Sequence, residues 1–377
     1  MAITNPVRPV FVGSAVFRVA GYGANHPLAI PRVATVMDIC SALGWLNDGN
    51  FHAATPAGIE TLARFHARDY IDALGAAEAA GTADPAIRER YNLGTRENPV
   101  FRGVFERAAT AVGGSVLAAK LATTHGIAYH PSGGTHHGRP DRASGFCYFN
   151  DPVFAILSFL DEGAGRVFYA DLDAHHGDGV QDAFAGDPRV FTVSIHEAGR
   201  WPHSGPAEDR GGGNARNLPV PRGCNDSEFA FLMAEAVLPL GRAFRPDAVV
   251  VTCGADGLAG DPLSAMALSN NALWDAVEKV ADLARSTVVL GGGGYNPWTV
   301  ARCWAGLWGR LNGWPTDTPL PATARDLLRR LDSDLVDDDE RPEHWFATLD
   351  DPRNDGPVRD EVRRVAALAL TGEIPHT

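Results

Sequence analysis

Short apolar runs rich in β-branched residues recur along the chain, and longer segments with helical periodicity lie between them. Each run is short enough to be a buried strand. The predicted strands span residues 126–130, 166–173, 189–196, 247–253 and 286–290. Helices are predicted over about 101–123, over 227–243 after the capping residues Asp226 and Ser227, and over 270–284 after Ser269. Strands that alternate with helices predict an α/β fold with a mostly parallel sheet covered on both faces.

From about residue 315 the pattern changes to proline, aspartate and arginine, and a helical stretch follows near 357–370. The acidic run DDDE in this part is most simply a solvated face. We therefore expect a main domain over residues 1–315 and a C-terminal extension over residues 316–377 that packs on the same domain.

Composition and charge narrow the range of partners. The formal net charge is −13, and the only lysines are Lys120 and Lys279, so no lysine-rich tract follows a phosphate backbone and direct nucleic-acid binding is not expected. No run of about 18 apolar residues predicts a membrane span, and the N-terminus lacks a basic leader with a cleavage site. The five cysteines stand apart without a CxxC pair, which argues against disulfides and a cysteine zinc site. We expect a cytoplasmic protein.

The strongest chemical signal is the segment YADLDAHHGD, residues 169–178, at the end of a predicted strand. Because side chains alternate between the faces of a strand, Asp171, Asp173 and His175 point the same way if the extended geometry continues. Two carboxylates and an imidazole that converge at a strand end are costly unless a cation neutralises them. These donors suit zinc, iron or manganese. The simpler alternative is a surface loop rich in His and Asp, but here an apolar strand delivers the cluster to the sheet end.

A catalytic zinc usually has three protein ligands and one open position. Asp173 and His175 supply two ligands, and the segment CGADGLAGDP, residues 253–262, offers Asp256 or Asp261 as the third. The chemistry of the residues alone leaves the choice between these two aspartates open.

A glycine-rich loop carries the adjacent residues His136 and His137. Their ordinary pKa lies near working pH, so they are candidates for metal binding or for acid–base catalysis. Asp171 and Asp178 are the carboxylates available to orient them.

Four glycines, residues 291–294, follow the last predicted strand. They are not followed by GK[ST], so they do not predict a phosphate-binding loop. Glycine lets the backbone approach a neighbour closely and leaves Tyr295 to project a hydroxyl that can stabilise an oxyanion. The sequence contains no GxSxG or HExxH motif, and neither lysine lies in these segments, which argues against serine, HExxH-type or Schiff-base chemistry.

Four blocks, in the same order, resemble the signatures of the histone deacetylase superfamily. They are GGTHHGRPDRASGFCYFND (133–151), YADLDAHHGDGV (169–180), CGADGLAGDP (253–262) and LGGGGYN (290–296). The likeness runs from about residue 17 to about 315. The chain is similar to bacterial deacetylases of the acetoin-utilisation type and to the class I enzymes.

The resemblance implies an arginase/deacetylase-like three-layer α/β fold with one eight-stranded, mostly parallel sheet. Residues 1–315 then form the deacetylase catalytic domain. The resemblance assigns the third zinc ligand to Asp261 and gives Asp256 a structural or supporting role.

The resemblance also implies a buried potassium ion beside the zinc. Its contributors are Asp171, Asp173, His175, Ser194 and Ile195. A second monovalent site is implied at backbone carbonyls near Phe184, Asp187 and Val190.

The implied reaction is zinc-dependent hydrolysis of an acylated amine. His136 pairs with Asp171 and tunes the electrostatics of the site. His137 pairs with Asp178 and serves as general base and then as general acid. Tyr295 donates a hydrogen bond to the tetrahedral oxyanion.

The implied substrate enters a narrow channel. Phe146 and Trp201 flank this channel, and Gly145 accepts a hydrogen bond from the scissile amide. Glu97 stands where family members often have an aspartate that grips the substrate backbone. Leu268 takes the gatekeeper position at which polyamine-selective relatives place a glutamate, which favours N6-acetyl-lysine in an acetylated protein or peptide over an N-acetylpolyamine.

Two other functions are weighed against this reading. A ureohydrolase with two manganese ions needs an aspartate where this chain has Gly177, so we expect one catalytic metal. A non-catalytic reader of acyl groups is disfavoured by the intact ligands and Tyr295. Pro262 stands where class I enzymes often have an arginine, which argues against regulation by inositol phosphates.

Overall fold

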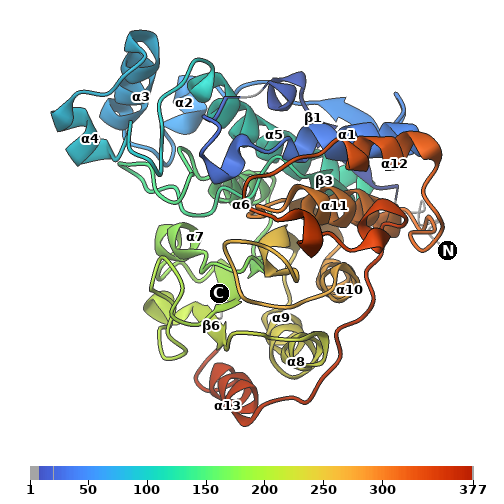
Figure 1. The fold of residues 1–377 in the computed structure, drawn as a ribbon. Helices are drawn as coiled ribbons and strands as arrows, with labels where there is room; N and C mark the ends of the chain where they lie inside the picture. Colours follow the sequence, from blue (N-terminus) through green and yellow to red (C-terminus); the bar gives the residue numbers. More distant parts are fainter. Residues whose placement is uncertain (1–7, 20, 376–377) are drawn as a thin grey trace.

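A single sheet of eight parallel strands forms the centre of the computed structural model, which describes residues 8–19 and 21–375 (Figure 1). The strand order is β2-β1-β3-β8-β7-β4-β5-β6. The strands are β1 (Val10–Gly13), β2 (Phe51–Ala53), β3 (Ile127–His130), β4 (Val167–Asp171), β5 (Val190–Glu197), β6 (Ala215–Val220), β7 (Ala248–Thr252) and β8 (Ser286–Leu290). The five strands predicted from the sequence are confirmed. Strands β1, β2 and β6 were not predicted from the apolar pattern. Strands β1 and β2 are short, and β6 is interrupted by polar residues and a proline.

Side chains of the strands alternate between two helical layers, which confirms the three-layer α/β fold. Along β7, for example, Val249 and Val251 join one core cluster, whereas Val250 joins the other. The first face is covered by α1 (Arg32–Ala42), α8 (Asp226–Leu232), α9 (Leu238–Phe244), α10 (Asn270–Ala281) and α11 (Pro297–Leu311). The second face is covered by α5 (Val104–His125), α6 (Asp151–Asp161) and α7 (Asp178–Ala183). A smaller group projects beside α5 and consists of α2 (Ile59–Leu62), α3 (Arg68–Ala80) and α4 (Pro85–Tyr91) (Figure 1).

The helix predicted over 227–243 differs from the observed one in two details. Its N-cap is Asn225, whose side chain accepts from the backbone N–H of Glu228 in a capping box, and not Asp226 or Ser227. Asp226 instead accepts hydrogen bonds from the backbone and hydroxyl of Ser269. A π-helical turn, Met233–Val237, separates α8 from α9 just before Pro239, which has no N–H to donate. For α10, the predicted cap Ser269 is confirmed.

The order of the strands decides which loops meet. After β3 the chain builds β4, β5 and β6 toward one edge, and β7 and β8 then fill the gap between β4 and β3. Because all the strands are parallel, the loops after β3, β8, β7 and β4 emerge side by side at the carboxyl edge. Ligands bind at this edge in open α/β sheets.

The C-terminal segment packs on the rest of the molecule. It contains α12 (Ala322–Arg329), which contacts α1, and α13 (Asp360–Ala369), which contacts β6 and α8 (Figure 1). Between them, the buried Arg302 of α11 donates to the carbonyls of Thr348 and Asp350 and to the carboxylate of Asp351. The division at residue 315 stays a prediction, and residues 1–7, 20 and 376–377 of the two ranges lie outside the described residues. Within the described ranges, no helix has the length and apolar character needed to cross a membrane.

Asp351→Asn is expected to weaken this attachment in a pH-dependent way. Asp351 Oδ1 lies 2.6 Å from Arg302 Nη1 and 3.4 Å from His344 Nε2. Burial by itself raises the pKa of Asp351, but His344 and Arg302 outweigh burial and lower it. A lowered folded-state pKa gives stability that is fully present above the unfolded-state pKa and is lost as the pH falls.

The free energy of unfolding of Asp351→Asn should therefore be about 2 kcal/mol below that of the wild type at neutral pH. The difference should shrink on acidification toward about pH 3. Urea unfolding at both pH values measures it, with the exposed Asp339→Asn as the matched control. A difference that does not change with pH would exclude a role for the charge.

Candidate active site and metal centre

Strand β4 ends at Asp171, and the chain then bends. The expected alternation along an extended strand therefore stops before Asp173 and His175. The bend brings these two residues together, because His175 N donates to Asp173 Oδ1 over 2.9 Å and His175 Nδ1 lies 3.2 Å from the same oxygen. All three side chains are buried.

The two candidate aspartates after β7 lie differently with respect to this cluster. Ligand atoms of Asp173, His175 and Asp256 all lie within 4.8 Å of one another. His175 Nδ1 is 2.9 Å from Asp256 Oδ2. Asp261 is also buried, and its oxygens accept hydrogen bonds from the backbone N–H groups of Tyr295 (2.7 Å) and Leu263 (2.9 Å). The structure therefore groups Asp256 with Asp173 and His175, and the assignment of Asp261 as the third ligand stays a prediction.

The charges in this cluster suit a bound cation. Burial, reinforced by repulsion from Asp256, raises the pKa of Asp261 well above its ordinary value. Burial and the nearby Asp173 likewise raise the pKa of Asp256. A divalent cation would remove this repulsion, and carboxylate oxygen with imidazole nitrogen is a suitable donor set for zinc.

The four-glycine segment approaches these carboxylates closely, as the sequence predicted. Gly293 N donates to Asp173 Oδ2 over 2.6 Å. A Cβ at position 293 would lie only 2.0 Å from Asp256 Oδ2, so no side chain fits there. The segment thereby delivers Tyr295 to the cavity described below.

Position 177 is closed to a second metal ligand. A Cβ on Gly177 would lie 2.0 Å from Asp171 Oδ2 and 3.4 Å from His136 Nδ1. An aspartate at this position would therefore collide with the charged groups already present. The number of catalytic metal ions stays a prediction.

The two adjacent histidines are held by the two carboxylates that the resemblance assigned. His136 Nδ1 lies 2.8 Å from Asp171 Oδ2, and His137 Nδ1 lies 2.7 Å from Asp178 Oδ1. Burial by itself lowers the pKa of His136, but Asp171 and Asp173 outweigh it and raise the pKa to about 9. Burial, together with the charge of His136, lowers the pKa of His137 to about 3. The structure thus gives the two rings opposite electrostatic environments.

The residues assigned to the two implied potassium sites are arranged differently in the structure. Asp171 and Ser194 are register partners on β4 and β5, and Ile195 is next along β5, whereas Asp173 and His175 lie in the bend after β4. At the second site, the carbonyl oxygens of Phe184, Asp187 and Val190 all face the side-chain amide of Asn214.

A cavity of about 650 Å³ opens beside His175 of the candidate metal site. His137, His175 and Tyr295 line it together with the aromatic side chains of Phe146 and Trp201. The Trp201 ring stands edge-on to His137 at 4.6 Å, and the Phe146 ring stands edge-on to Tyr295 at 5.9 Å. The predicted aromatic flanks therefore lie in the wall of the same cavity as the candidate catalytic groups.

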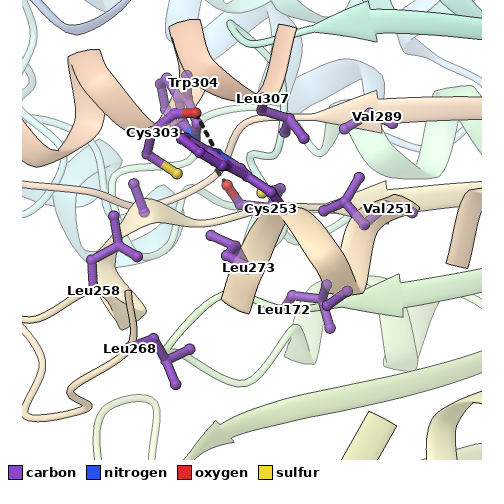
Figure 2. Packing of buried hydrophobic residues seen from close by; sticks show 14 of the residues in the cluster. Leu172, Val251, Cys253, Leu258, Leu268, Leu273, Val289, Cys303, Trp304 and Leu307 are labelled. Atoms are coloured by element: carbon purple, nitrogen blue, oxygen red, sulfur yellow. Dashed lines mark hydrogen bonds between the residues drawn. The ribbon is translucent and has the colours of Figure 1, made fainter. Parts of the chain in front are cut away.

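Leu268 does not line this cavity, and the prediction of a gatekeeper at this position is wrong. Its side chain is 1% exposed and belongs to the hydrophobic core cluster that also contains Met266. Figure 2 shows it in the same cluster as Leu258. Leu263, five residues earlier in the same loop, lines the cavity instead. The family resemblance pointed to this loop, but the path of the loop decides which of its leucines faces the cavity.

Glu97 lies at the cavity wall, but its carboxylate is already bonded within the protein. Oε1 accepts from Gly145 N over 2.6 Å, and Oε2 accepts from Asn92 Nδ2 over 2.9 Å. Gly145 and Phe146 both have positive φ, 54° and 67°, and a phenylalanine rarely adopts this conformation. A Cβ on Gly145 would lie 2.4 Å from Trp201. Glu97 therefore stabilises a tight corner that presses against Trp201.

A further pair at the cavity mouth was not identified from the sequence. Glu197 accepts from Arg200 Nε (2.5 Å) and from Ala265 N (2.7 Å), so it links the loop of Trp201 to the loop of Leu263. The i,i+3 spacing of Glu197 and Arg200 after a strand was the only local signal. The contact of Glu197 with Ala265 N depends on the tertiary fold.

Comparison with known proteins gives a consistent result. A model of the histone deacetylase domain matches residues 26–311. Acetoin utilization protein AcuC of Bacillus subtilis is 35% identical over 320 residues, which cover 81% of this chain and 82% of that protein. The probable histone deacetylase 19 of Zea mays is 38% identical, with 75% of this chain and 56% of the relative covered. The chain thus spans little more than half the length of this plant relative.

Solved structures show the same similarity. The crystal structure of an HDAC homolog from Aquifex aeolicus has a TM-score of 0.91 and 35% identity, and the match covers 97% of this chain and 100% of that chain. An HDAC homolog complexed with SAHA has a TM-score of 0.90 at 35% identity.

Proposed function

This chain belongs to the histone deacetylase family, and we propose that it is a zinc-dependent hydrolase that removes the acetyl group from N6-acetyl-lysine in proteins or peptides. One observation carries the proposal. A single cavity is lined by His137, His175 and Tyr295, which offer a base, a metal ligand and an oxyanion donor, between the rings of Phe146 and Trp201.

The proposed ligands of one zinc ion are Asp173, His175 and Asp261. Bound there, zinc would supply Lewis-acid polarisation of the acyl carbonyl and acidify a water molecule. We also propose a structural potassium ion beside it, held by groups of Asp171, Asp173, His175, Ser194 and Ile195. The five cysteines are all free and buried, which supports a reducing, cytoplasmic location.

His137 is proposed as the proton carrier because it faces the cavity and His136 does not line it. Asp178 binds Nδ1 of His137, so the neutral ring carries its proton on Nδ1 and leaves Nε2 free. Nε2 can then accept a proton from water and return it to the leaving amine. His136, bonded to Asp171, supplies fixed positive charge beside it.

Tyr295 is proposed to donate its hydroxyl proton in a hydrogen bond to the tetrahedral oxyanion. Burial raises the pKa of Tyr295 well above its ordinary value, which keeps the hydroxyl protonated. The Gly145 carbonyl belongs to the corner held by Glu97 and is proposed to accept a hydrogen bond from the scissile amide. Phe146 and Trp201 then enclose the aliphatic part of the substrate.

The charges at the cavity mouth favour acetyl-lysine over an acetylated polyamine. The carboxylates of Glu97 and Glu197 are both bonded inside the protein. Arg200 and Arg222 also line the mouth. Because Arg200 is paired with Glu197, the remaining ammonium groups of a polyamine would meet the guanidinium group of Arg222 and carboxylates that are already engaged.

Parallel kinetics on an acetyl-lysine peptide and an N-acetylpolyamine test this proposal. The purified zinc-loaded chain should release acetate from the peptide with the higher kcat/KM, and a chelator should abolish the release. Faster turnover of the polyamine would replace the proposed substrate class. Release of acetate from neither substrate would support a non-catalytic reader of acyl groups.

Glu97→Ala should lower kcat/KM about tenfold, because it leaves the half-buried Gly145 N–H without its partner and loosens the Phe146 corner. Glu97→Gln retains an acceptor oxygen and should keep most of the activity. Steady-state kinetics on a long peptide and on a minimal acetyl-lysine amide measure both variants. A KM increase confined to the long peptide, and equal in the two variants, would instead show that the carboxylate grips the substrate backbone.

A further inference from the structure

Three backbone carbonyls of the connection between α7 and β5 point at one place. They belong to Phe184, Asp187 and Val190, where the family resemblance implied a second monovalent cation. Converging carbonyl oxygens repel one another and require a positive or hydrogen-bonding partner.

The partner in this chain is the side chain of Asn214. Its Nδ2 lies 2.7 Å from Phe184 O, 3.0 Å from Asp187 O and 2.8 Å from Val190 O. The side chain comes from the residue just before β6, and Asn214 is 4% exposed. One nitrogen therefore occupies the centre of the carbonyl cluster.

The orientation of this amide is fixed by a fourth contact. Asn214 Oδ1 accepts from Gly186 N over 2.9 Å. With the amide turned around, Oδ1 would face three carbonyl oxygens and the NH₂ group would face an N–H donor. Only the observed orientation gives each group a complementary partner.

We propose that Asn214 replaces the second monovalent cation, so that this carbonyl cluster is closed by an amide and binds no potassium or sodium. A cation coordinated by the same three oxygens would need the position that Nδ2 holds. The neutral amide stabilises the turn without the cost of dehydrating an ion. The inference does not depend on the proposed deacetylase activity.

With this replacement, the stability of the β5–β6 edge of the sheet should not depend on monovalent cations. Asn214 joins the α7–β5 connection to the start of β6, and its own carbonyl accepts from Thr192 N of β5 over 3.0 Å. The register of β5 and β6 is thus anchored by a covalently attached group. Any remaining response to potassium then arises at the site beside Asp171.

Thermal unfolding of Asn214→Ala in potassium chloride and in choline chloride of equal ionic strength tests the proposal. In choline chloride the Tm should fall by about 3–6 °C, because three contacts are lost. Potassium should restore a large part of this loss, because it can enter the opened carbonyl cluster. The gain in Tm from potassium should therefore be larger in the variant than in the wild type.

Two further variants separate this effect from a general loss of stability. Asn214→Asp replaces the donor by a carboxylate oxygen that the three carbonyls repel, so the side chain should turn aside and admit a cation, and this variant should show the largest potassium response. It also serves if Asn214→Ala does not fold. Asn312→Ala removes another amide-to-carbonyl hydrogen bond, to Trp308 O, and should respond to potassium as the wild type does.

Anomalous scattering from crystals of the wild type soaked in a rubidium salt gives a direct measurement. No rubidium peak is expected among the three carbonyls, and a peak is expected there in Asn214→Asp. A peak in the wild type, or equal potassium responses of the wild type and both Asn214 variants, would overturn the proposal.

Discussion

The Tyr295→Phe variant is expected to have a kcat about two to three orders of magnitude below that of the wild type while it retains its zinc. The side chain is 7% exposed, lines the cavity and stands edge-on to Phe146, so its ring position does not depend on the hydroxyl. The backbone N–H that bonds Asp261 is unchanged by the substitution. The substitution removes only the proposed donor to the oxyanion.

Steady-state kinetics on an acetyl-lysine peptide measure kcat, and elemental analysis measures the bound zinc. Tyr129→Phe is the matched control, because it removes another buried phenolic hydroxyl, bonded to Trp304 O on the core side of the sheet. It should lower stability and leave kcat unchanged. Unchanged turnover in Tyr295→Phe would remove this residue from the mechanism.

Asp261→Asn and Asp256→Asn are expected to differ sharply in zinc affinity. If Asp261 is the third ligand, its loss should weaken zinc binding by more than about a hundredfold, so that zinc is removed by dialysis. Loss of Asp256, which contacts His175 Nδ1 and Ala174 N, should weaken zinc binding by only about 10- to 100-fold. Activity without added zinc should follow the same order.

Competition with a chromophoric chelator measures both affinities, and Asp209→Asn, outside the cluster, controls for the loss of one negative charge. This comparison matters because the structure groups Asp256, and not Asp261, most tightly with Asp173 and His175. If Asp256→Asn loses its zinc and Asp261→Asn keeps it, the assignment from family resemblance is wrong.

The fold followed from the sequence wherever burial acts on one continuous segment. Five apolar runs became the central strands because those strands are covered on both faces, and both of their faces are therefore apolar. Strand β6 was missed because Arg216 and Asn217 make it polar. Arg216 is nevertheless 2% exposed, because its guanidinium reaches the carbonyls of Ala369 and Glu373 in the C-terminal segment.

The candidate site was predictable where its functional residues lie within a few positions of one another in the sequence. The segment from Asp171 to Asp178, the adjacent histidines and the four glycines each mark one loop. Parallel strands bring such loops to a common edge. The sequence could not show which of the polar groups in those loops are already bonded within the protein.

Leu268, Glu97 and Asn214 show why the remainder required the structure. Leu268 is buried because its loop turns into the core beside Leu258, and Glu97 is bonded to a corner 48 residues away. Asn214 reaches carbonyls up to 30 residues earlier in the chain. None of these partners lies at a fixed sequence spacing from its residue, so no local sequence pattern predicts the contact.

The sequence by itself determined an α/β fold, the loops that carry the chemistry, and the residue types suited to a metal and a proton carrier. It did so because strand burial, glycine conformation and ligand type depend on short segments. Only the tertiary structure decided that Asp256 lies closest to Asp173 and His175, that Leu263 faces the cavity, and that an amide fills the second carbonyl cluster. These outcomes depend on distances between segments that only the packing of the sheet and its helices sets.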